Sequence, residues 1–477
     1  MKQRVFGTLV AMAALLSGCG GSGGSTSTAT GAAPTPTPTG TVTTSGCSLR
    51  ERQDWAAAQL KEWYLFPDTL PTVFDPTPYS TVQAYIDALT ATARAQRKDR
   101  YFTYLTSIAQ ENAYYNSGSS AGFGFRLGYD SGAQRVFAIE TFENTPALAA
   151  GIDRGTEILS IGTTADNMVP VSQLFASGGA QGVSDALGPN TAGTSRSFQI
   201  RTAGVTKTVT VTKSDYELTP VSSRYGAQII DDGGIKVGYV NLRTFISTAD
   251  PALRSAFAKF KAAGVTNVIV DLRYNGGGLI SISELFSDLL GAARSTSQVV
   301  DYTVFRSEKS ENNTTRYFMP QSESIAPTKI AFIGTAGTAS ASELVINAAI
   351  PYFHANAALI GTNTYGKPVG QIALDKAACD DRLRVIALAT QNSARQGDYY
   401  DGIASKVEAS CQAGDDIFYP LGDPREASTR TALDFLEGKS CTPIPANAVS
   451  SAGLSSKRVL LTPTHPSTAQ REAPGLF

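Results

Sequence analysis

Histidine is scarce in this sequence. Only two histidines, His354 and His465, occur among 477 residues, which argues against a histidine-rich metal site and leaves a Ser-His-Asp triad no other candidates. An excess of charge of either sign is also lacking, because 40 Lys and Arg residues face 41 Asp and Glu residues. No charge field therefore favours nucleic acid or a strongly acidic partner. The composition predicts neither a metal nor a cofactor.

Long apolar runs are equally rare. The one clear run, VFGTLVAMAALL at residues 5–16, follows two basic residues and is too short to span a bilayer comfortably. Residues 1–18 are therefore predicted to be an export signal. The motif LSGC at its end resembles a bacterial lipobox, which implies that Cys19 receives lipid and begins the mature protein. With Gly20 next, the resemblance implies a lipoprotein of the bacterial cell envelope that faces the periplasm, at the outer membrane. An ordinary signal peptide with an incidental cysteine is the alternative.

Cysteine is sparse too, with five in the chain. Removing Cys19 leaves an even number, which in an exported protein indicates disulfides. Three connectivities of the remaining four cysteines are possible. We expect Cys379–Cys411, which closes a local loop, and Cys47–Cys441, which joins the two ends of the chain.

Composition divides the first part of the chain into segments. Residues 19–46 are rich in Gly, Ser, Thr and Pro and lack the apolar side chains of a core, so they are predicted to be a lipid-anchored, disordered linker. Residues 47–115 place apolar side chains at helical spacing behind capping-box patterns at Ser48 and Ser80. These patterns predict a small N-terminal helical cap. At the other end, residues 443–477 are predicted to be a tail.

Residues 116–215 have the pattern of short strands and turns. Two hairpins are predicted, with turns at residues 130–132 and near 203–204. The stretch PALAAGI at residues 146–152, followed by GTEILSI, resembles a PDZ domain. The resemblance implies a peptide-binding loop, in which small residues expose N–H groups to an anion and aromatic rings line a pocket. An ordinary strand with a tight bend is the alternative. The loop residues are Gly122, Phe123, Gly124 and Phe125.

Strands and helices alternate in residues 216–442. IKVGYVNLRTF, NVIVDLRYN, TKIAFIG and AALIGTN read as strands, and the second is nearly all apolar, as expected of a buried strand. DPALRSAFAKFKAAG is an amphipathic helix that ends at Gly264. The prediction is an α/β core with crossover helices and a C-terminal extension, so the chain as a whole is expected to be an α/β multidomain protein.

The stretch GTASASELVINAAI, residues 337–350, follows the third of these strands. Its S-x-x-E pattern fits a capping box that accounts for Ser340 and Glu343 and leaves Ser342 unused. Ser342 would lie in the first turn of a helix, beside unpaired N–H groups and the positive end of the helix dipole. That environment suits a nucleophile, since an oxyanion formed on its substrate has donors nearby. Helix capping alone is the other interpretation.

A nucleophile needs a base, and the shortage of histidine directs attention to lysine. Lys367 follows Ser342 after one further predicted strand, in a turn that could return beside the helix start. Burial would lower its pKa from about 10.4 towards neutrality, so that it could accept a proton. The Gln371 amide could orient the amine without adding charge. By itself, Lys367 would be an ordinary solvated lysine.

The combination of motifs resembles the carboxyl-terminal processing (tail-specific) peptidases. The motifs that carry the resemblance are DLRYNGGG, then GTASASE between a strand and a helix, then YGKPVGQ. Together with the PDZ-like stretch, the resemblance covers roughly residues 100–375. The resemblance implies a serine peptidase core in which Ser342 is the nucleophile, Lys367 the base and Gln371 its support. It also implies that the PDZ domain engages the C-termini of protein or peptide substrates. Lys367-Pro368 departs from the GKG common in the family, a change that fixes the turn.

The triple glycine of DLRYNGGG is the predicted source of the second oxyanion donor. Glycines let the backbone approach a reacting carbonyl, and relatives often have Asn-Pro-Gly-Gly here, where proline has no N–H. We therefore expect the N–H of Gly277 to pair with that of Glu343. A tight strand-to-helix turn is the alternative reading of these glycines.

Two rival functions are considered. The first is a catalytically silent, peptidase-like PDZ scaffold that binds peptide ends, and the intact set of Ser342, Lys367 and Gln371 argues against it. The second is a penicillin-binding type of enzyme, which requires S-x-x-K and fails because position 345 is valine. The sequence predicts a serine endopeptidase of exported proteins or peptides and does not indicate an oligomeric state.

Overall fold

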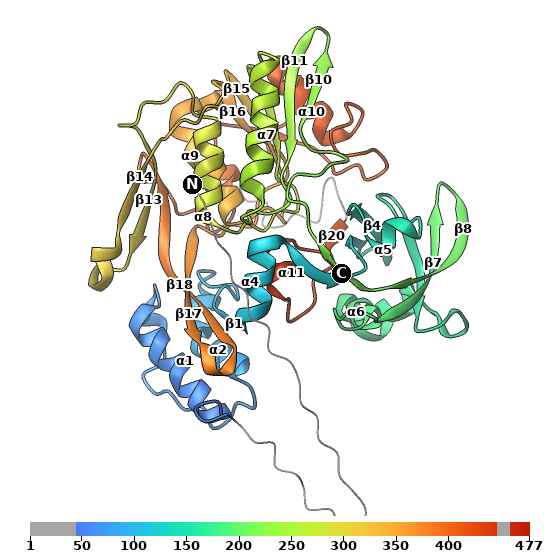
Figure 1. Cartoon of the computed structure of the whole chain (residues 1–477), viewed down its shortest axis with the longest axis vertical. Helices are drawn as coiled ribbons and strands as arrows, with labels where there is room; N and C mark the ends of the chain where they lie inside the picture. The colour runs from blue at the N-terminus through green and yellow to red at the C-terminus, as the bar shows by residue number, and fades with distance from the viewer. Residues whose placement is uncertain (1–43, 446–457) are drawn as a thin grey trace, which may run out of the picture. The chain divides into compact units, whose positions relative to one another are not determined.

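The computed structural model describes residues 44–445 and 458–477 (Figure 1). The predicted export signal at residues 1–18, the lipidation site Cys19, and nearly all of the linker at residues 19–46 lie outside the described residues. Part of the predicted tail, residues 446–457, also lies outside them. Within the two described stretches, no helix combines the length and the apolar character needed to cross a membrane.

A six-stranded sheet organises the segment that was predicted to be the α/β core. Five of its strands run parallel, and only β10 is antiparallel to its neighbour β11. The central strands are buried on both faces, as parallel strands covered by helices are expected to be. The order is β10 (Gln228–Asp232), β11 (Ile235–Asn241), β12 (Asn267–Asp271), β15 (Lys329–Gly334), β16 (Ala357–Gly361) and β19 (Ala409–Gln412).

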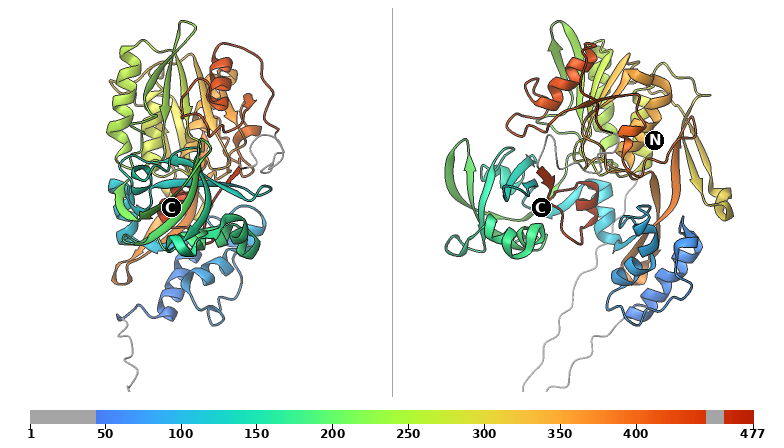
Figure 2. Two further views of the ribbon diagram at one scale, coloured as in Figure 1. Left: turned by 90° about the vertical axis from the view of Figure 1, so that its right-hand side faces the viewer. Right: turned by 180° about the vertical axis from the view of Figure 1, so that it is seen from behind.

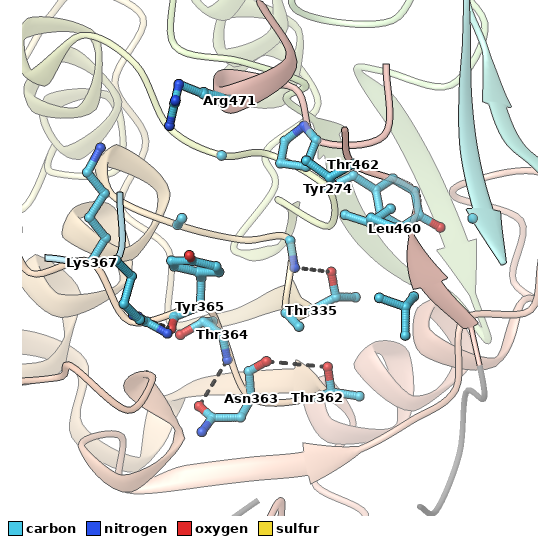
Figure 3. A pocket seen from close by; sticks show the side chains of 18 of the residues that line it. Tyr274, Thr335, Thr362, Asn363, Thr364, Tyr365, Lys367, Leu460, Thr462 and Arg471 are labelled. Atoms are coloured by element: carbon cyan, nitrogen blue, oxygen red, sulfur yellow. Dashed lines mark hydrogen bonds between the residues drawn. The ribbon is translucent and has the colours of Figure 1, made fainter. Parts of the chain in front are cut away.

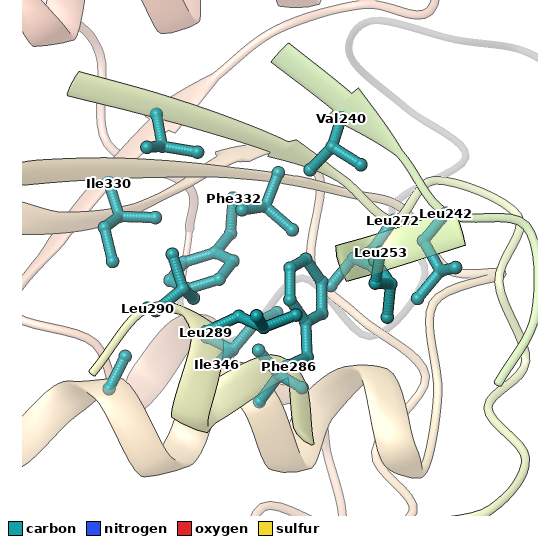
Figure 4. Packing of buried hydrophobic residues seen from close by; sticks show 14 of the residues in the cluster. Val240, Leu242, Leu253, Leu272, Phe286, Leu289, Leu290, Ile330, Phe332 and Ile346 are labelled. Atoms are coloured by element: carbon teal, nitrogen blue, oxygen red, sulfur yellow. The ribbon is translucent and has the colours of Figure 1, made fainter. Parts of the chain in front are cut away.

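Helices cover both faces of this sheet. On one face, α7 (Ala249–Ala262), α8 (Ile280–Leu289) and α9 (Ala341–Phe353) contribute to a core in which Phe286, Phe332 and Ile346 meet (Figure 4). Full burial of each such side chain contributes about 1.5–3 kcal/mol. On the other face lies α10 (Ala427–Leu436), whose apolar residues pack against β11, β12, β15 and β16. The C-terminal extension, which supplies β19 and α10, therefore completes the core.

A second, antiparallel sheet joins the N-terminal helices to the segment of residues 216–442. The helices α1 (Leu49–Trp63), α2 (Val82–Leu89) and α3 (Ala91–Ala95) pack against the hairpin of β17 and β18. The predicted capping box at Ser48 is confirmed, but Thr81 rather than Ser80 caps α2, because the Thr81 hydroxyl accepts from the Ala84 N–H. The sheet contains β1 (Tyr104–Ser107), β13 (Val299–Phe305), β14 (Thr314–Tyr317), β17 (Val369–Lys376) and β18 (Asp381–Asn392).

Residues 116–215, called the β-rich unit below, form a third sheet. Both predicted hairpin turns are confirmed, between β3 and β4 and between β7 and β8. The short helix α5 (Pro146–Ala149) and the longer α6 (Val171–Leu187) accompany it, and Figure 2 shows the unit from two further sides. Its main strands are β3 (Phe125–Asp130), β4 (Arg135–Thr141), β5 (Glu157–Gly162), β7 (Ser195–Thr202) and β8 (Val205–Thr212).

The last part of the chain returns to the β-rich unit. β20 (Arg458–Leu460) pairs antiparallel with β3 and thereby becomes the edge strand of the third sheet. The short helix α11 (Thr468–Glu472) follows, and it lies beside α4 (Ile108–Ser117). Residues 458–477 are called the C-terminal segment below.

The predicted disulfide pairing is wrong. The structure joins Cys47 to Cys379 and Cys411 to Cys441, in place of Cys379–Cys411 and Cys47–Cys441. Cys379 lies at the tip of the β17–β18 hairpin, which extends towards the start of α1. Cys411 lies in the edge strand β19 of the other sheet, next to the chain that leaves α10. The packing around the two sheets, and not distance along the sequence, therefore determines which cysteines lie close together.

Candidate active site

The loop after β12 carries the DLRYNGGG motif, and buried ion pairs hold its start. The guanidinium of Arg273 donates to Asp271 at 3.0 Å and to Glu426 of the C-terminal extension at 2.9 Å. The Tyr239 hydroxyl also donates to Asp271, at 2.7 Å. The next residue, Tyr274, has a φ of 63°, a left-handed backbone conformation that is uncommon for a side chain of this size. The Asp and Arg of the motif therefore position this loop, called the glycine loop below.

The first turn of α9 lies directly against the glycine loop. The N-cap residue Ser340 has a φ of 56°, and a Cβ added to Gly277 would lie 2.7 Å from the Ser340 Cβ. Only glycine permits this approach. Ser342 is fully buried, and its hydroxyl donates to the Asn275 carbonyl oxygen at 3.0 Å.

The carboxylate of Glu343 fastens the loop that carries Lys367 to the first turn of α9. It is fully buried and accepts from the Thr364 hydroxyl at 2.5 Å, the Gly366 N–H at 2.7 Å and the Lys367 N–H at 2.8 Å. The Ser340 N–H donates to it as well, at 3.0 Å, which is the backbone half of the expected capping box. Burial raises the pKa of Glu343, while these hydrogen bonds act in the opposite direction. Sequence reasoning missed this function of the side chain.

Lys367 is partly buried, with its amine turned towards Gln371. The Nζ donates to the Gln371 Oε1 at 3.0 Å and lies 5.2 Å from the centre of the Phe102 ring. Burial lowers the pKa of Lys367, and the carboxylate of Glu472 acts in the opposite direction. Among the hydrogen bonds of the described residues, none joins Lys367 to Ser342. The structure thus places the predicted serine and lysine on neighbouring elements, each with another partner.

One of the two predicted oxyanion donors, the Gly277 N–H, is also engaged. The Gly277 N–H donates to the Asn275 side-chain oxygen at 2.9 Å, within its own loop. The neighbouring Gly276 N–H donates to the Glu472 carbonyl oxygen of the C-terminal segment, at 2.9 Å. The backbone of α11 therefore lies on the glycine loop.

A cavity of about 630 Å³ opens beside these elements (Figure 3). Lys367 and Tyr365 line one side of it, and Leu460 and Thr462 of the C-terminal segment line another. The N-terminal cap contributes as well, because Arg100 donates to the Tyr365 carbonyl at 2.7 Å. Sequence reasoning assigned nothing to this part of the cap, and no motif in it signals the role.

The Gly-Phe run lies where β2 (Ser119–Gly122) leads into β3. Phe123 and Phe125 are fully buried and pack on Phe198, with ring centroids 5.2 and 6.0 Å away. Their side chains therefore belong to the core of the β-rich unit. The N–H groups of Gly124 and Phe125 both donate to the Phe477 carbonyl oxygen, at 3.0 and 3.4 Å. A Cβ added to Gly122 would lie 2.8 Å from the Phe477 carbonyl carbon.

His354 lies away from this site. It is exposed at the end of α9, where its Nδ1 lies 2.8 Å from a carboxylate oxygen of Glu408.

Comparisons with known proteins show that part of the chain is similar to one family. Residues 236–396 match the sequence profile of Peptidase family S41. The chain is 26% identical over 260 residues to the carboxyl-terminal-processing peptidase 3, chloroplastic, of Arabidopsis thaliana, a match that covers 53% of this chain and 46% of that protein. It is 26% identical over 255 residues to the carboxyl-terminal-processing protease of a Synechocystis species, which covers 53% and 54%. Over these regions the chain is similar to carboxyl-terminal-processing proteases, and it spans about half the length of the curated relatives it matches.

Solved structures support the fold. A protein of Bacteroides fragilis assigned to the S41 proteases superposes with a TM-score of 0.62 at 22% identity, and the match covers 80% of this chain and 97% of that chain. At this level of identity the likeness shows the fold alone. The chain has an α/β S41 protease fold.

Proposed function

We propose that this chain is a serine endopeptidase that cleaves exported proteins or peptides by a serine–lysine acyl-enzyme mechanism. The observation that carries the proposal is the buried Glu343 carboxylate. It accepts from both Ser340 and Lys367 N–H groups, and so holds the lysine loop against the helix turn that carries Ser342. The two elements that carry the proposed nucleophile and base are thereby held together, which supports the proposal.

In the proposed mechanism, Lys367 acts in its neutral form. The lowered pKa makes this form accessible, and the Gln371 amide orients the amine without adding a charge. The amine takes the proton of the Ser342 hydroxyl as the oxygen attacks the peptide carbonyl carbon. The protonated amine then gives that proton to the leaving nitrogen as the peptide bond breaks. Water, deprotonated by the same amine, hydrolyses the acyl-serine and releases the second product.

The described arrangement must change before this reaction can occur. The Ser342 hydroxyl has to leave the Asn275 carbonyl, and the Lys367 amine has to turn from Gln371 towards it. The N–H groups of Gly277 and Glu343 would stabilise the oxyanion, so Gly277 must also release the Asn275 side chain. Movement of the glycine loop alone would change two of these three contacts, because both involve Asn275.

The β-rich unit is proposed to be a PDZ-like module that engages substrates near their C-termini. Its support is the pair of N–H groups on Gly124 and Phe125. Both donate to the backbone oxygen of Phe477, at the edge of β3. A peptide could add there as a further strand. An N-terminal lipid anchor on Cys19 and a place in the periplasm, at the outer membrane, are part of the same proposal.

One observation favours a second candidate, a peptide-binding scaffold without activity. Ser342 has no exposed surface, and its hydroxyl is bonded to a backbone carbonyl rather than to Lys367. A scaffold would keep this arrangement permanently, whereas a peptidase would leave it when substrate binds.

Labelling with a serine-reactive fluorophosphonate distinguishes the two. We expect the native chain to be labelled in the presence of a peptide substrate, and Ser342→Ala to remain unlabelled. Ser340→Ala is the matched control, since it removes a hydroxyl from the same turn and should still be labelled. Absence of labelling in the native chain, together with binding of peptide, would favour the scaffold.

A further inference from the structure

The edge of β3 is filled by the C-terminal segment. β20 pairs antiparallel with Gly128–Asp130, and the Leu461 N–H donates to the Leu127 carbonyl at 3.0 Å. Further along the same edge, the Leu127 N–H donates to the Gly475 carbonyl at 2.8 Å, and the Phe477 N–H donates to the Phe125 carbonyl at 3.0 Å. Residues 458–461 and 475–477 therefore form one interrupted strand along the whole edge.

The side chains of this interrupted strand enter the core of the β-rich unit. Leu461 is fully buried and Phe477 is 3% exposed, and both belong to the same apolar cluster as Phe123 and Phe125. The carbonyl oxygen of Phe477 receives the two N–H groups of the Gly-Phe run. The segment thus occupies the two backbone donors proposed above for a peptide, and its Phe477 side chain packs in the apolar cluster beside them.

Between its two strand pieces, the segment reaches the glycine loop. Besides the bond from the Gly276 N–H to the Glu472 carbonyl, the Glu472 side chain accepts from the Tyr115 hydroxyl at 3.0 Å. Arg126 of β3 donates to the Pro474 carbonyl at 2.5 Å and to the Tyr274 carbonyl at 2.8 Å. One segment therefore covers the peptide edge and contacts the loop beside Ser342.

We propose that residues 458–477 are a tethered competitor that occupies the peptide groove of the β-rich unit, so that a substrate must displace them before it can be cleaved. This inference rests on the proposed function and adds its regulation and ligand class. While the segment is in place, the Gly276 N–H donates to the Glu472 carbonyl oxygen. This hydrogen bond restrains the glycine loop. Its displacement would release the peptide edge and the loop together.

The segment also indicates the chemistry of the ligand. Phe477 fills an apolar pocket, which favours ligands with a large apolar residue at the corresponding position. Two residues earlier, Gly475 has a φ of 86°, and a Cβ there would lie 2.8 Å from the Arg126 Cγ and 2.9 Å from the Leu127 carbonyl oxygen. A side chain cannot enter this position without a shift of β3. The predicted ligand class is a peptide with Gly-apolar-Phe or a close equivalent.

Tethering makes the competition effective. A segment joined to the same chain acts at an effective concentration of about millimolar. A free peptide of equal intrinsic affinity must be present above that concentration to displace it. If the segment fills the groove for about nine-tenths of the time, a free peptide binds about tenfold more weakly than to the open groove. The measured affinity should rise by that factor when the segment is displaced.

The test is a binding measurement on full-length protein with Ser342→Ala, so that no cleavage occurs. The probe is a fluorescent peptide TAQREAPGLF, the sequence of residues 468–477. We expect Gly475→Val, which cannot adopt the bound conformation beside β3, to bind the probe about tenfold more tightly than its parent. Gly204→Val is the matched control, because Gly204 has a φ of 83° in a hairpin turn with no atom near its Cβ position. It should bind the probe as the parent does.

A second variant removes the pocket side chain. Phe477→Asp should also bind the probe about tenfold more tightly, while Val205→Asp, at a residue 67% exposed on the far edge strand β8, should not. If Phe477→Asp fails to fold, Gly475→Val still decides. Equal affinity of the parent and Gly475→Val, or no binding to either, overturns the inference. Because the readout is binding, this outcome is independent of whether Ser342 proves to be a nucleophile.

Discussion

The two segments that approach the candidate site are held in different ways. The loop that carries Lys367 is held by a fully buried carboxylate, Glu343, in the first turn of α9. The C-terminal segment is held mainly along the edge of β3, by strand hydrogen bonds and by Leu461 and Phe477. Releasing the first would leave a buried charge without partners, whereas releasing the second uncovers a strand edge and the apolar surface that Leu461 and Phe477 cover. The comparison predicts that the loop carrying Lys367 stays in place while the C-terminal segment is exchanged.

The largest expected effect is on the core side of this comparison, at Ser342. Ser342→Ala should lower peptide cleavage by on the order of 10⁴-fold, because the group that forms the acyl intermediate is lost. The fold should be unchanged, as measured by circular dichroism and thermal unfolding. Ser340→Ala should keep most of the activity. Full cleavage by Ser342→Ala would remove the serine from the mechanism.

Lys367 should follow closely. Lys367→Arg keeps the positive charge but cannot lose its proton in the working range, so it should be about a thousandfold less active, like Lys367→Ala. His354→Gln should remain active, since that histidine is exposed at the far end of α9. Steady-state cleavage of a reporter peptide measures all three. A rate near that of the native chain in Lys367→Arg would return attention to the histidines.

The pH dependence tests the same lysine without a substitution. Burial lowers its pKa, and only the neutral amine can accept a proton, so kcat/KM should rise with pH through that lowered value. Below it, activity should fall about tenfold for each pH unit. The rise should occur at lower pH than the pKa of about 10.4 of an ordinary lysine. A flat profile from pH 5 to pH 10 would contradict the assignment of Lys367 as the base.

Glu343→Gln sharpens the comparison between the two segments. All the groups that face the Glu343 carboxylate donate hydrogen bonds to it, so the NH₂ of a glutamine would meet another donor. The change should lower the free energy of unfolding by about 1–3 kcal/mol. Activity should fall about tenfold, because Lys367 is less firmly placed. Denaturant unfolding and cleavage rates provide the measurements. Glu408→Gln, at an exposed carboxylate near the end of α9, is the control and should change neither.

The smallest difference is expected between the two disulfides. Cys47–Cys379 closes a separation of 332 residues and Cys411–Cys441 one of 30 residues. In the chain-entropy description the first should stabilise the fold by about 2 kcal/mol more than the second. Chemical unfolding of the Cys47→Ser/Cys379→Ser and Cys411→Ser/Cys441→Ser variants measures this difference. A larger loss for the second pair would mean that native contacts outweigh loop closure.

Much of the core could be predicted because its signals are local. The apolar run of β12, the helical spacing of α7 and the hairpin turns of the β-rich unit each lie within one short stretch. The disulfide partners could not be predicted, because Cys47 meets Cys379 only through packing of α1 on the β17–β18 hairpin.

The candidate site shows the same division. The motifs named Ser342, Lys367 and Gln371, and these assignments stay predictions until they are tested. The Glu343 carboxylate was missed because the S-x-x-E pattern already explained a glutamate there. The C-terminal segment was missed because its prolines and short apolar stretches give no strand pattern, and its order comes from the edge of β3.

The Cys47–Cys379 bond has a mechanical consequence. A pull on the chain at residue 44 would enter the fold at Cys47, two residues before α1 begins at Leu49. The covalent bond would carry this load to the tip of the β17–β18 hairpin and bypass α1, which would otherwise unwind from its first turn. From that tip the load runs along β17, the strand that contains Gln371, the hydrogen-bond partner of Lys367. Tension at this end of the protein would therefore be felt at the amine, and α1 would stay folded while it was transmitted.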